Sequence, residues 1–163
     1  MSMLVHWFVL TGTEKEVPQV RREIVDKVRA WGVPLDEGTT DAIRLVASEL
    51  IANAVVHGKG PITVGLRYRP GRLAIDVLDG DPSVPRTGRV RADDESGRGL
   101  ALVGLLAACC AWKPVGSGKR VWAEIELPMV VPVTRAAVPC GLSAKWAEQQ
   151  VVTKPKAPAL AVA

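Results

Sequence analysis

The segment at residues 62–78 constrains the fold of this chain more than any other. Residues 62–68 alternate between apolar and other side chains, which is the period of a strand with one buried face. The turn sequence Arg-Pro-Gly-Arg follows at residues 69–72, and a second alternating run follows at residues 73–78. Two alternating runs joined by so short a turn predict an antiparallel hairpin.

Three helices and two further strands are predicted around this hairpin. Helices are predicted where apolar residues recur at steps of three and four, and strands where a short run is apolar or alternating. Glycines end the first two helices, at Gly32 and Gly58. The predicted helices are residues 13–31, 36–56 and 100–112, and the predicted strands are residues 3–10 and 121–127.

Two segments lack a clear period. Residues 79–96 are polar and contain proline, so we expect a mobile loop or lid there. Beyond the last predicted strand Pro, Ala and Val dominate. We therefore expect one domain over residues 1–128 and a largely disordered tail over residues 129–163, with a short helix near residues 142–150.

The net charge does not favour nucleic acid as a partner. It is +4, and residues 130–163 hold four Lys or Arg residues against one Glu, so the remainder of the chain is close to neutral. No stripe of Lys and Arg with interleaved aromatic residues occurs in the sequence. We expect no direct binding of nucleic acid.

Cysteine usage and hydropathy favour a cytoplasmic protein. Of the three cysteines, Cys109 and Cys110 are adjacent within the third predicted helix, where pairing with each other is geometrically poor. We find no basic segment ahead of an apolar run near the N-terminus, and the longest apolar run, residues 100–112, is too short to span a bilayer. We expect a soluble, cytoplasmic chain with reduced thiols and no membrane contact.

Glu49 and Asn53 are the first candidate site residues. They are four residues apart on the second predicted helix, so their side chains lie on one face, at the edge of its apolar stripe. An Asn oxygen can coordinate Mg²⁺, and a Glu carboxylate can accept a proton from a nucleophile. Taken singly, either residue is more simply a solvated helix residue.

Asp79 and Gly80 end the hairpin's second strand. A carboxylate at this place can accept a hydrogen bond from an exocyclic amine, as adenine has. The alternative is that Asp79, Gly80 and the following Asp81-Pro82 form an ordinary turn, which these residue types favour.

A glycine-rich joint, Ser96-Gly-Arg-Gly-Leu100, opens the third predicted helix. Glycines permit close backbone approach, and the N–H groups at a helix start bind anions, so Gly97 and Gly99 suit a phosphate loop. Arg98 could contact a phosphate or be solvated. The alternative is a plain loop-to-helix joint.

The order of these motifs resembles the Bergerat-type (GHKL) ATPase superfamily of gyrase, heat-shock chaperones, histidine kinases and mismatch-repair proteins. More narrowly, it resembles the stand-alone bacterial anti-sigma-factor serine kinases. The resemblance covers about residues 5–128. It rests on residues 17–21, 49–58, 77–85, 95–103 and 112–124.

This resemblance implies a fold, a cofactor and a set of residue roles. The fold would be a two-layer α/β sandwich, with helices on one face of a mixed, mostly antiparallel sheet. Asn53 would coordinate Mg²⁺ on bound ATP, Glu49 would be the general base and Asp79 would bind the adenine amine, whereas His57 is given a structural role. The other implied ATP-binding residues are Gly80, Gly97, Arg98, Gly99 and Leu100.

The same resemblance implies a serine kinase. It would phosphorylate an anti-anti-sigma (STAS-type) partner, sequester a sigma factor and form a homodimer. Two departures stand against the family pattern: Asp79-Gly80-Asp81-Pro82 lacks a second glycine, and Arg120 and Val121 stand near the place of a usual Thr. A nucleotide-binding interaction module without kinase activity is therefore the alternative, and a binder that has lost ATP is a third.

Overall fold

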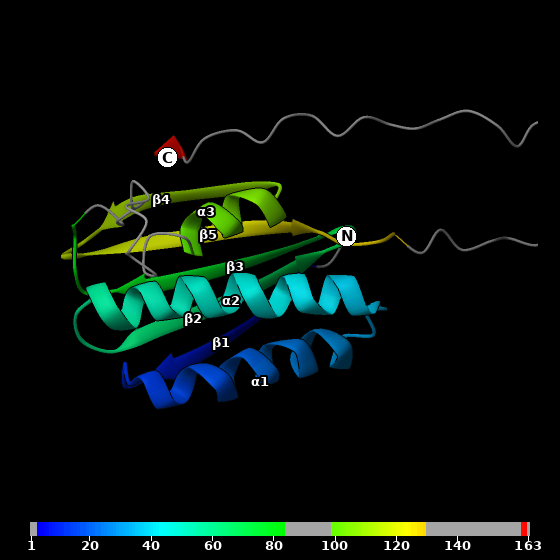
Figure 1. Ribbon diagram of the computed structural model, residues 1–163, viewed down its shortest axis with the longest axis horizontal. Helices are drawn as coiled ribbons and strands as arrows, with labels where there is room; N and C mark the ends of the chain where they lie inside the picture. Colours follow the sequence, from blue (N-terminus) through cyan, green and yellow to red (C-terminus); the bar gives the residue numbers. More distant parts are fainter. Residues whose placement is uncertain (1–2, 84–98, 130–160, 163) are drawn as a thin grey trace, which may run out of the picture.

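A computed structural model of the chain describes residues 3–83, 99–129 and 161–162, which contain one six-stranded sheet (Figure 1). The strand order is β1-β2-β3-β5-β4-β6. The first five strands in this order pair antiparallel, and the short β6 pairs parallel with β4. The strands are β1 (Leu4–Leu10), β2 (Ile62–Arg69), β3 (Arg72–Asp79), β4 (Cys109–Val115), β5 (Gly118–Glu126) and β6 (Ala161–Val162).

Helices cover one face of the sheet, which confirms the predicted two-layer α/β sandwich (Figure 1). The helix α1 lies beside β1, α2 crosses the middle of the sheet, and α3 lies over the β4–β5 side. The central helix, α2, contacts both other helices. The helical elements are η1 (Glu14–Glu16), α1 (Val17–Ala30), α2 (Glu37–His57) and α3 (Gly99–Leu106).

The long helix α2 is specified locally at both ends. The side chain of Asp36 accepts a hydrogen bond from the backbone N–H of Thr39 at 2.6 Å and so caps the first turn. At the other end the N–H of Gly58 donates to the carbonyl of Ala54 at 2.8 Å. Between them one face is buried against the sheet, consisting of Ile43, Val46, Ala47, Leu50, Ile51 and Ala54.

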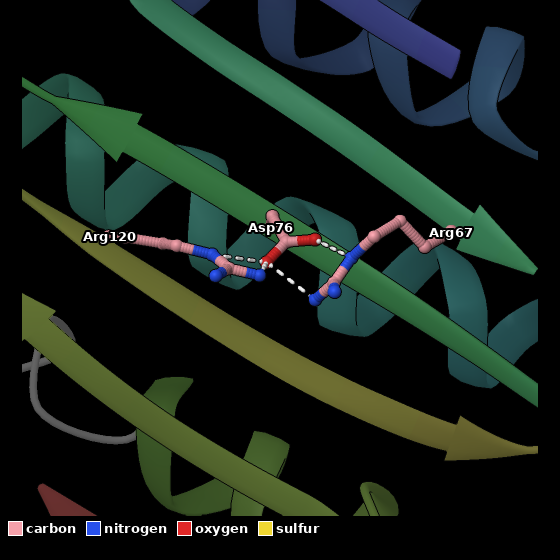
Figure 2. A network of polar contacts seen from close by, with 3 residues as sticks. All are labelled: Arg67, Asp76 and Arg120. Atoms are coloured by element: carbon pink, nitrogen blue, oxygen red, sulfur yellow. Dashed lines mark hydrogen bonds and ion pairs between the residues drawn. The ribbon is translucent and has the colours of Figure 1, made fainter. Parts of the chain in front are cut away.

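Side chains alternate along the strands between the helix-covered face and the open face. In β3, Ile75 and Val77 are buried in the core under the helices, whereas Asp76 lies on the opposite face. Asp76 is fully buried because two arginines from neighbouring strands cover it (Figure 2). The hairpin and its alternation are thus as the sequence predicts.

The Asp76 carboxylate joins three strands. Arg67 of β2 donates from Nε to Oδ2 at 2.9 Å and from Nη2 to Oδ1 at 3.1 Å. Arg120 of β5 donates from Nε to Oδ1 at 2.6 Å and also through Nη2 (Figure 2). The Arg120 guanidinium also lies 4.9 Å from the ring centre of Trp122. This network links β2 and β5 through β3, which lies between them.

The third predicted helix is wrong in its second half. Residues 100–112 do not form one helix: α3 ends at Leu106, and β4 begins at Cys109. A continuous apolar run has no period that separates a buried helix from a buried strand, so the sequence pattern could not locate the change. The change follows from pairing, because β4 runs antiparallel to β5 with Trp112 opposite Val121.

Placing Cys109 and Cys110 in a helix was therefore also wrong. They are neighbours on β4, where successive side chains point to opposite faces. Cys109 is exposed, and Cys110 packs against the core. Burial, followed by the adjacent Cys109, raises the pKa of the Cys110 thiol to about 11.

The other predicted elements agree with the structure to within about three residues. The last strand begins at Gly118 rather than at residue 121, and the first helix begins with the η1 turn. The lid beyond residue 83 and the short helix near residues 142–150 lie outside the described residues, and the domain boundary at residue 128 stays a prediction. The strand β6 was not predicted.

Candidate functional site

A hollow of about 310 Å³ lies between the C-terminal half of α2 and the start of α3. Glu49 and Asn53 both line it, as their spacing of four residues on one helix requires. Gly99 and Leu100 line it from α3. Four of the predicted site residues therefore meet in one place. The complete lining is Glu49, Ala52, Asn53, Val56, His57, Gly99 and Leu100.

Gly99 of α3 lies directly against the side chain of Glu49 of α2 in this hollow. A Cβ atom at position 99 would lie 1.8 Å from Oε2 of Glu49 and 2.8 Å from its Cδ. Only a residue without a side chain leaves the Glu49 carboxylate where it is. The group that Gly99 accommodates in the structure is the carboxylate of the predicted base, whereas the predicted contact of Gly99 with phosphates stays a prediction.

Asp79 lies at the end of β3, beside the end of α2. A Cβ atom at Gly58 would lie 2.8 Å from Cγ of Asp79, so the carboxylate packs directly against the residue that ends the helix. The Asp79 side chain is 1% exposed. Its Oδ1 accepts hydrogen bonds from Lys119 Nζ at 3.0 Å and from the N–H of Asp81 at 2.8 Å.

The second oxygen of this carboxylate is unpartnered. Oδ2 of Asp79 is buried and has no hydrogen-bond partner among the described residues. A buried carboxylate oxygen normally accepts at least one hydrogen bond, so this atom requires a donor from elsewhere. The unused acceptor lies on the carboxylate for which the sequence predicts contact with an amine.

Lys119 is the site residue that the sequence analysis missed. It stands opposite Asp79 in the β3–β5 register, and its side chain is 1% exposed. Its ammonium donates to Asp79 Oδ1 and to the carbonyl of Asp81, each at 3.0 Å. The signal was the alternation of the last strand: the buried face of Val121, Ala123 and Ile125 extends back by two residues to Lys119.

Asp79 and Gly80 do not line the hollow between α2 and α3. Both line a second, more open hollow of about 430 Å³, together with Lys59 and Gly118. Gly80 donates its N–H to the carbonyl of Lys59 at 2.7 Å, and a Cβ at position 80 would lie 2.7 Å from that oxygen. The predicted residues therefore form two adjacent groups, which meet where Gly58 packs on Asp79.

Two predicted residues cannot be placed. Gly97 and Arg98 lie outside the described residues, so their predicted contact with phosphates stays a prediction. His57, which was predicted to be structural, is the last residue of α2 and lines the first hollow. Its position brings it within the same wall as Asn53.

Within residues 3–83 and 99–129, no three His, Cys, Asp or Glu side chains gather in a way that could hold a metal ion. No helix of the described part of the chain has the length and hydropathy needed to cross a membrane.

Comparison with known proteins places most of the sandwich in one family. No curated protein matches this chain. The family model described as "Histidine kinase-like ATPase domain" matches residues 10–125, from the end of β1 to the end of β5. This range includes both helices of the first hollow and the Asp79–Lys119 pair. The chain belongs to the histidine kinase-like ATPase domain family, a group of the GHKL type.

Proposed function

We propose that this protein binds ATP with Mg²⁺ and acts as an anti-sigma-factor serine kinase. It phosphorylates a serine of an anti-anti-sigma (STAS-type) partner. Once the phosphorylated partner has been released, the protein binds a sigma factor. The observation that carries the proposal is the convergence of Glu49, Asn53 and Gly99 on one hollow, beside a buried carboxylate at Asp79.

The residues fit an adenine nucleotide. The buried Oδ2 of Asp79 lacks a donor, which an exocyclic amine supplies. The first hollow, at about 310 Å³, lies within the range of small-molecule sites, roughly 300–1,000 Å³. Gly99 opens α3, and the free N–H groups of a helix start suit a phosphate.

The residues also fit a magnesium ion whose remaining ligands are oxygens of phosphates and water. Mg²⁺ is commonly bound through one or two protein oxygens plus substrate phosphates. Asn53 provides a neutral amide oxygen in the wall of the first hollow. Its role would be to hold the metal at one ligand position, one helical turn from Glu49.

Glu49 would act as the general base. When bound, ATP supplies the transferable γ-phosphoryl group, and Mg²⁺ neutralises charge on the phosphate oxygens. Glu49 would accept the proton that the partner's serine hydroxyl loses during transfer. Gly99 would keep the carboxylate in place, because no side chain at that position displaces it.

A second function of a different class is a nucleotide-binding interaction module without kinase activity. The sequence Asp79-Gly80-Asp81-Pro82 favours it, because the second glycine of the family pattern is absent. Hydrogen bonds within the segment also hold it: Oδ1 of Asp81 accepts one from the N–H of Ser83 at 2.9 Å and one from the Ser83 hydroxyl at 2.5 Å.

Two measurements, made one after the other, test the proposal. Titration calorimetry with ATP, in Mg²⁺ and then in EDTA, should give binding that depends on the metal. Incubation with γ-labelled ATP and a purified STAS-type protein should then transfer label to a serine of that protein. Binding without transfer to any STAS-type protein from the same source would support the module, and no ATP binding would remove both functions. Size exclusion with and without a sigma factor tests the sigma-factor partner and the homodimer expected from the sequence.

A further inference from the structure

The outer edge of β1 pairs with no other strand of the described residues (Figure 1). At the opposite edge of the sheet, β6 pairs with β4. Natural edge strands are commonly protected by charged residues, proline or bulges, because their free N–H and C=O groups can pair with another chain. The sequence of β1, Leu-Val-His-Trp-Phe-Val-Leu, contains no Lys, Arg, Asp, Glu or Pro, and its register with β2 has no bulge. This edge therefore lacks the usual protection against strand pairing.

A hollow of about 190 Å³ lies between the end of β1 and the helices η1 and α1. No residue of β2 lines it, so it lies on the outer side of β1, where α1 runs beside the strand (Figure 1). Phe8, Leu10 and Val20 provide its apolar part. Glu16 and Glu23 also line it, whereas no Lys or Arg does.

The two carboxylates of this hollow have no cation of their own. Neither Glu16 nor Glu23 forms an ion pair with another described residue, and Glu23 Oε1 accepts a hydrogen bond from Gln19 Nε2 at 2.8 Å. Hydrogen bonds from Thr13 and Thr11 lower the pKa of Glu16 from 4.5 to about 2, so Glu16 is ionised at neutral pH. The hollow therefore presents uncompensated negative charge beside a free strand edge.

The other face of β1 is apolar and exposed. Val5, Trp7 and Val9 alternate along the strand on the face away from the helices, and each is between 42% and 75% exposed. We call these three residues the β1 stripe. The ring of Trp7 lies over Gly65 of β2, where an added Cβ would lie 2.3 Å from a ring atom. A strand added beside β1 would place alternate side chains next to the β1 stripe and the others in the hollow.

We propose that the free edge of β1 is a docking site for an extended segment of a partner protein in which basic and apolar residues alternate. The main chain of that segment pairs with β1 and extends the sheet. Its basic side chains lie in the hollow, where their aliphatic stems cover apolar surface and their charged groups reach Glu16 and Glu23. Its apolar side chains pack beside the β1 stripe.

A second copy of this chain does not offer that chemistry through the same edge. Pairing across a twofold axis would bring Leu4–Leu10 of the copy, which contains no Lys or Arg, against the two carboxylates. Charge complementarity therefore favours a basic partner segment over a dimer through β1. Docking at this edge needs no nucleotide, so its test is independent of the proposed function.

The probe is a fluorescein-labelled peptide of four Lys-Val repeats, and fluorescence anisotropy measures its affinity for the full chain. Extended, it spans about 26 Å, slightly more than the seven residues of β1. The same peptide with Glu in place of Lys should bind at least about tenfold more weakly.

Two further analogues, N-methylated on every Lys or on every Val, test strand pairing. In an extended chain the N–H groups of alternate residues point to the same edge, so only one of these sets faces β1. One analogue should therefore lose at least about tenfold in affinity, and the other should bind like the parent peptide.

Charge-reversal variants separate a local contact from general attraction. Glu23→Lys reverses one charge in the hollow and should weaken binding of the Lys-Val peptide by about fivefold or more. Glu37→Lys, in the first turn of α2, changes the net charge equally away from the hollow and should alter the affinity by less than about twofold. Thermal melting of each variant monitors folding, and Glu23→Gln carries the comparison if Glu23→Lys melts below the assay temperature.

Equal effects of the two charge reversals would overturn the proposal, because the attraction would then be non-specific. Equal affinities of the two N-methylated analogues would overturn strand pairing. No binding of the Lys-Val peptide by the folded wild type would overturn it as well, and a homodimer in size exclusion would then assign the edge to a second copy. None of these results would affect the proposed nucleotide site.

Discussion

Gly99 and Glu49 are in such close contact that a methyl group at position 99 would overlap the Glu49 carboxylate, at 1.8 Å from Oε2. The two residues come from different helices, α3 and α2, and from motifs about 50 residues apart in the sequence. Their contact links the glycine-rich joint to the predicted base.

Replacing Gly99 by alanine should lower phosphotransfer while the protein still folds. In Gly99→Ala the atom that must move is the end of a flexible side chain, so we expect the fold to persist and phosphotransfer to fall by about 100-fold, as for a displaced catalytic group. The control is Gly104→Ala in the same helix, where nothing lies within 4 Å of an added Cβ. That control should raise the free energy of unfolding by about 0.5–1 kcal/mol in a urea titration. Wild-type transfer by Gly99→Ala would contradict the proposed role of Glu49.

Asn53→Ala should abolish the part of ATP binding that depends on Mg²⁺. The variant removes the amide oxygen in the wall of the first hollow and leaves the Asp79 carboxylate untouched. Calorimetry in Mg²⁺ and in EDTA measures the difference. Gln19→Ala, which removes an exposed amide of α1 bonded to Glu23, is the matched control. Unchanged affinity of Asn53→Ala in Mg²⁺ would exclude the metal role.

Glu49→Ala should retain ATP binding and lose phosphotransfer. A general base contributes roughly 10²–10⁴-fold to a rate, so label transfer to the STAS-type partner should fall by at least about 100-fold. Glu37→Ala, in the first turn of the same helix, removes an exposed carboxylate and should transfer normally. Equal rates in Glu49→Ala and the wild type would exclude the base role.

Asp76→Asn should lower the free energy of unfolding without altering the residues of the proposed nucleotide site. The change removes the charge that pairs with Arg67 and Arg120, and since both arginines keep some contact with solvent we expect a loss of about 2–3 kcal/mol. Urea unfolding measures it. The exposed pair of Asp41 with Arg44, at 3.5 Å, is the comparison, and Asp41→Asn should cost less than about 0.5 kcal/mol. Equal effects of the two substitutions would show that burial of Asp76 is unimportant.

Glu16 should make stability dependent on pH in the acid range. Hydrogen bonds from the backbone and side chains of Thr13 and Thr11 lower its pKa from 4.5 to about 2. Because the folded state binds this proton less tightly than the unfolded state, the stabilisation is complete above about pH 4.5 and is lost as the pH falls through about 2. The difference in unfolding free energy between the wild type and Glu16→Gln should therefore be constant from pH 7 to 5 and shrink below. A difference that stays the same down to pH 2 would contradict this assignment.

Most of the fold could be predicted because apolar side chains repeat along each helix or strand with the period of that element. The hairpin at β2–β3 alternates around a Pro-Gly turn, and α2 has a cap at Asp36, an apolar face and a glycine at its end. The run at residues 100–112 has no such period, and its division into α3 and β4 depends on pairing with β5. Local periodicity therefore located the elements, and only strand pairing divided that run.

For the site, the sequence by itself determined that Glu49 and Asn53 share one helix face, because the spacing of residues on a helix is a local property. The tertiary structure decided what faces them and what faces Asp79. It placed Gly99 against Glu49, and it placed Lys119 opposite Asp79 although 40 residues separate them. Such contacts depend on helix packing and strand register, which are set by burial over the whole core and not by any local pattern of residues.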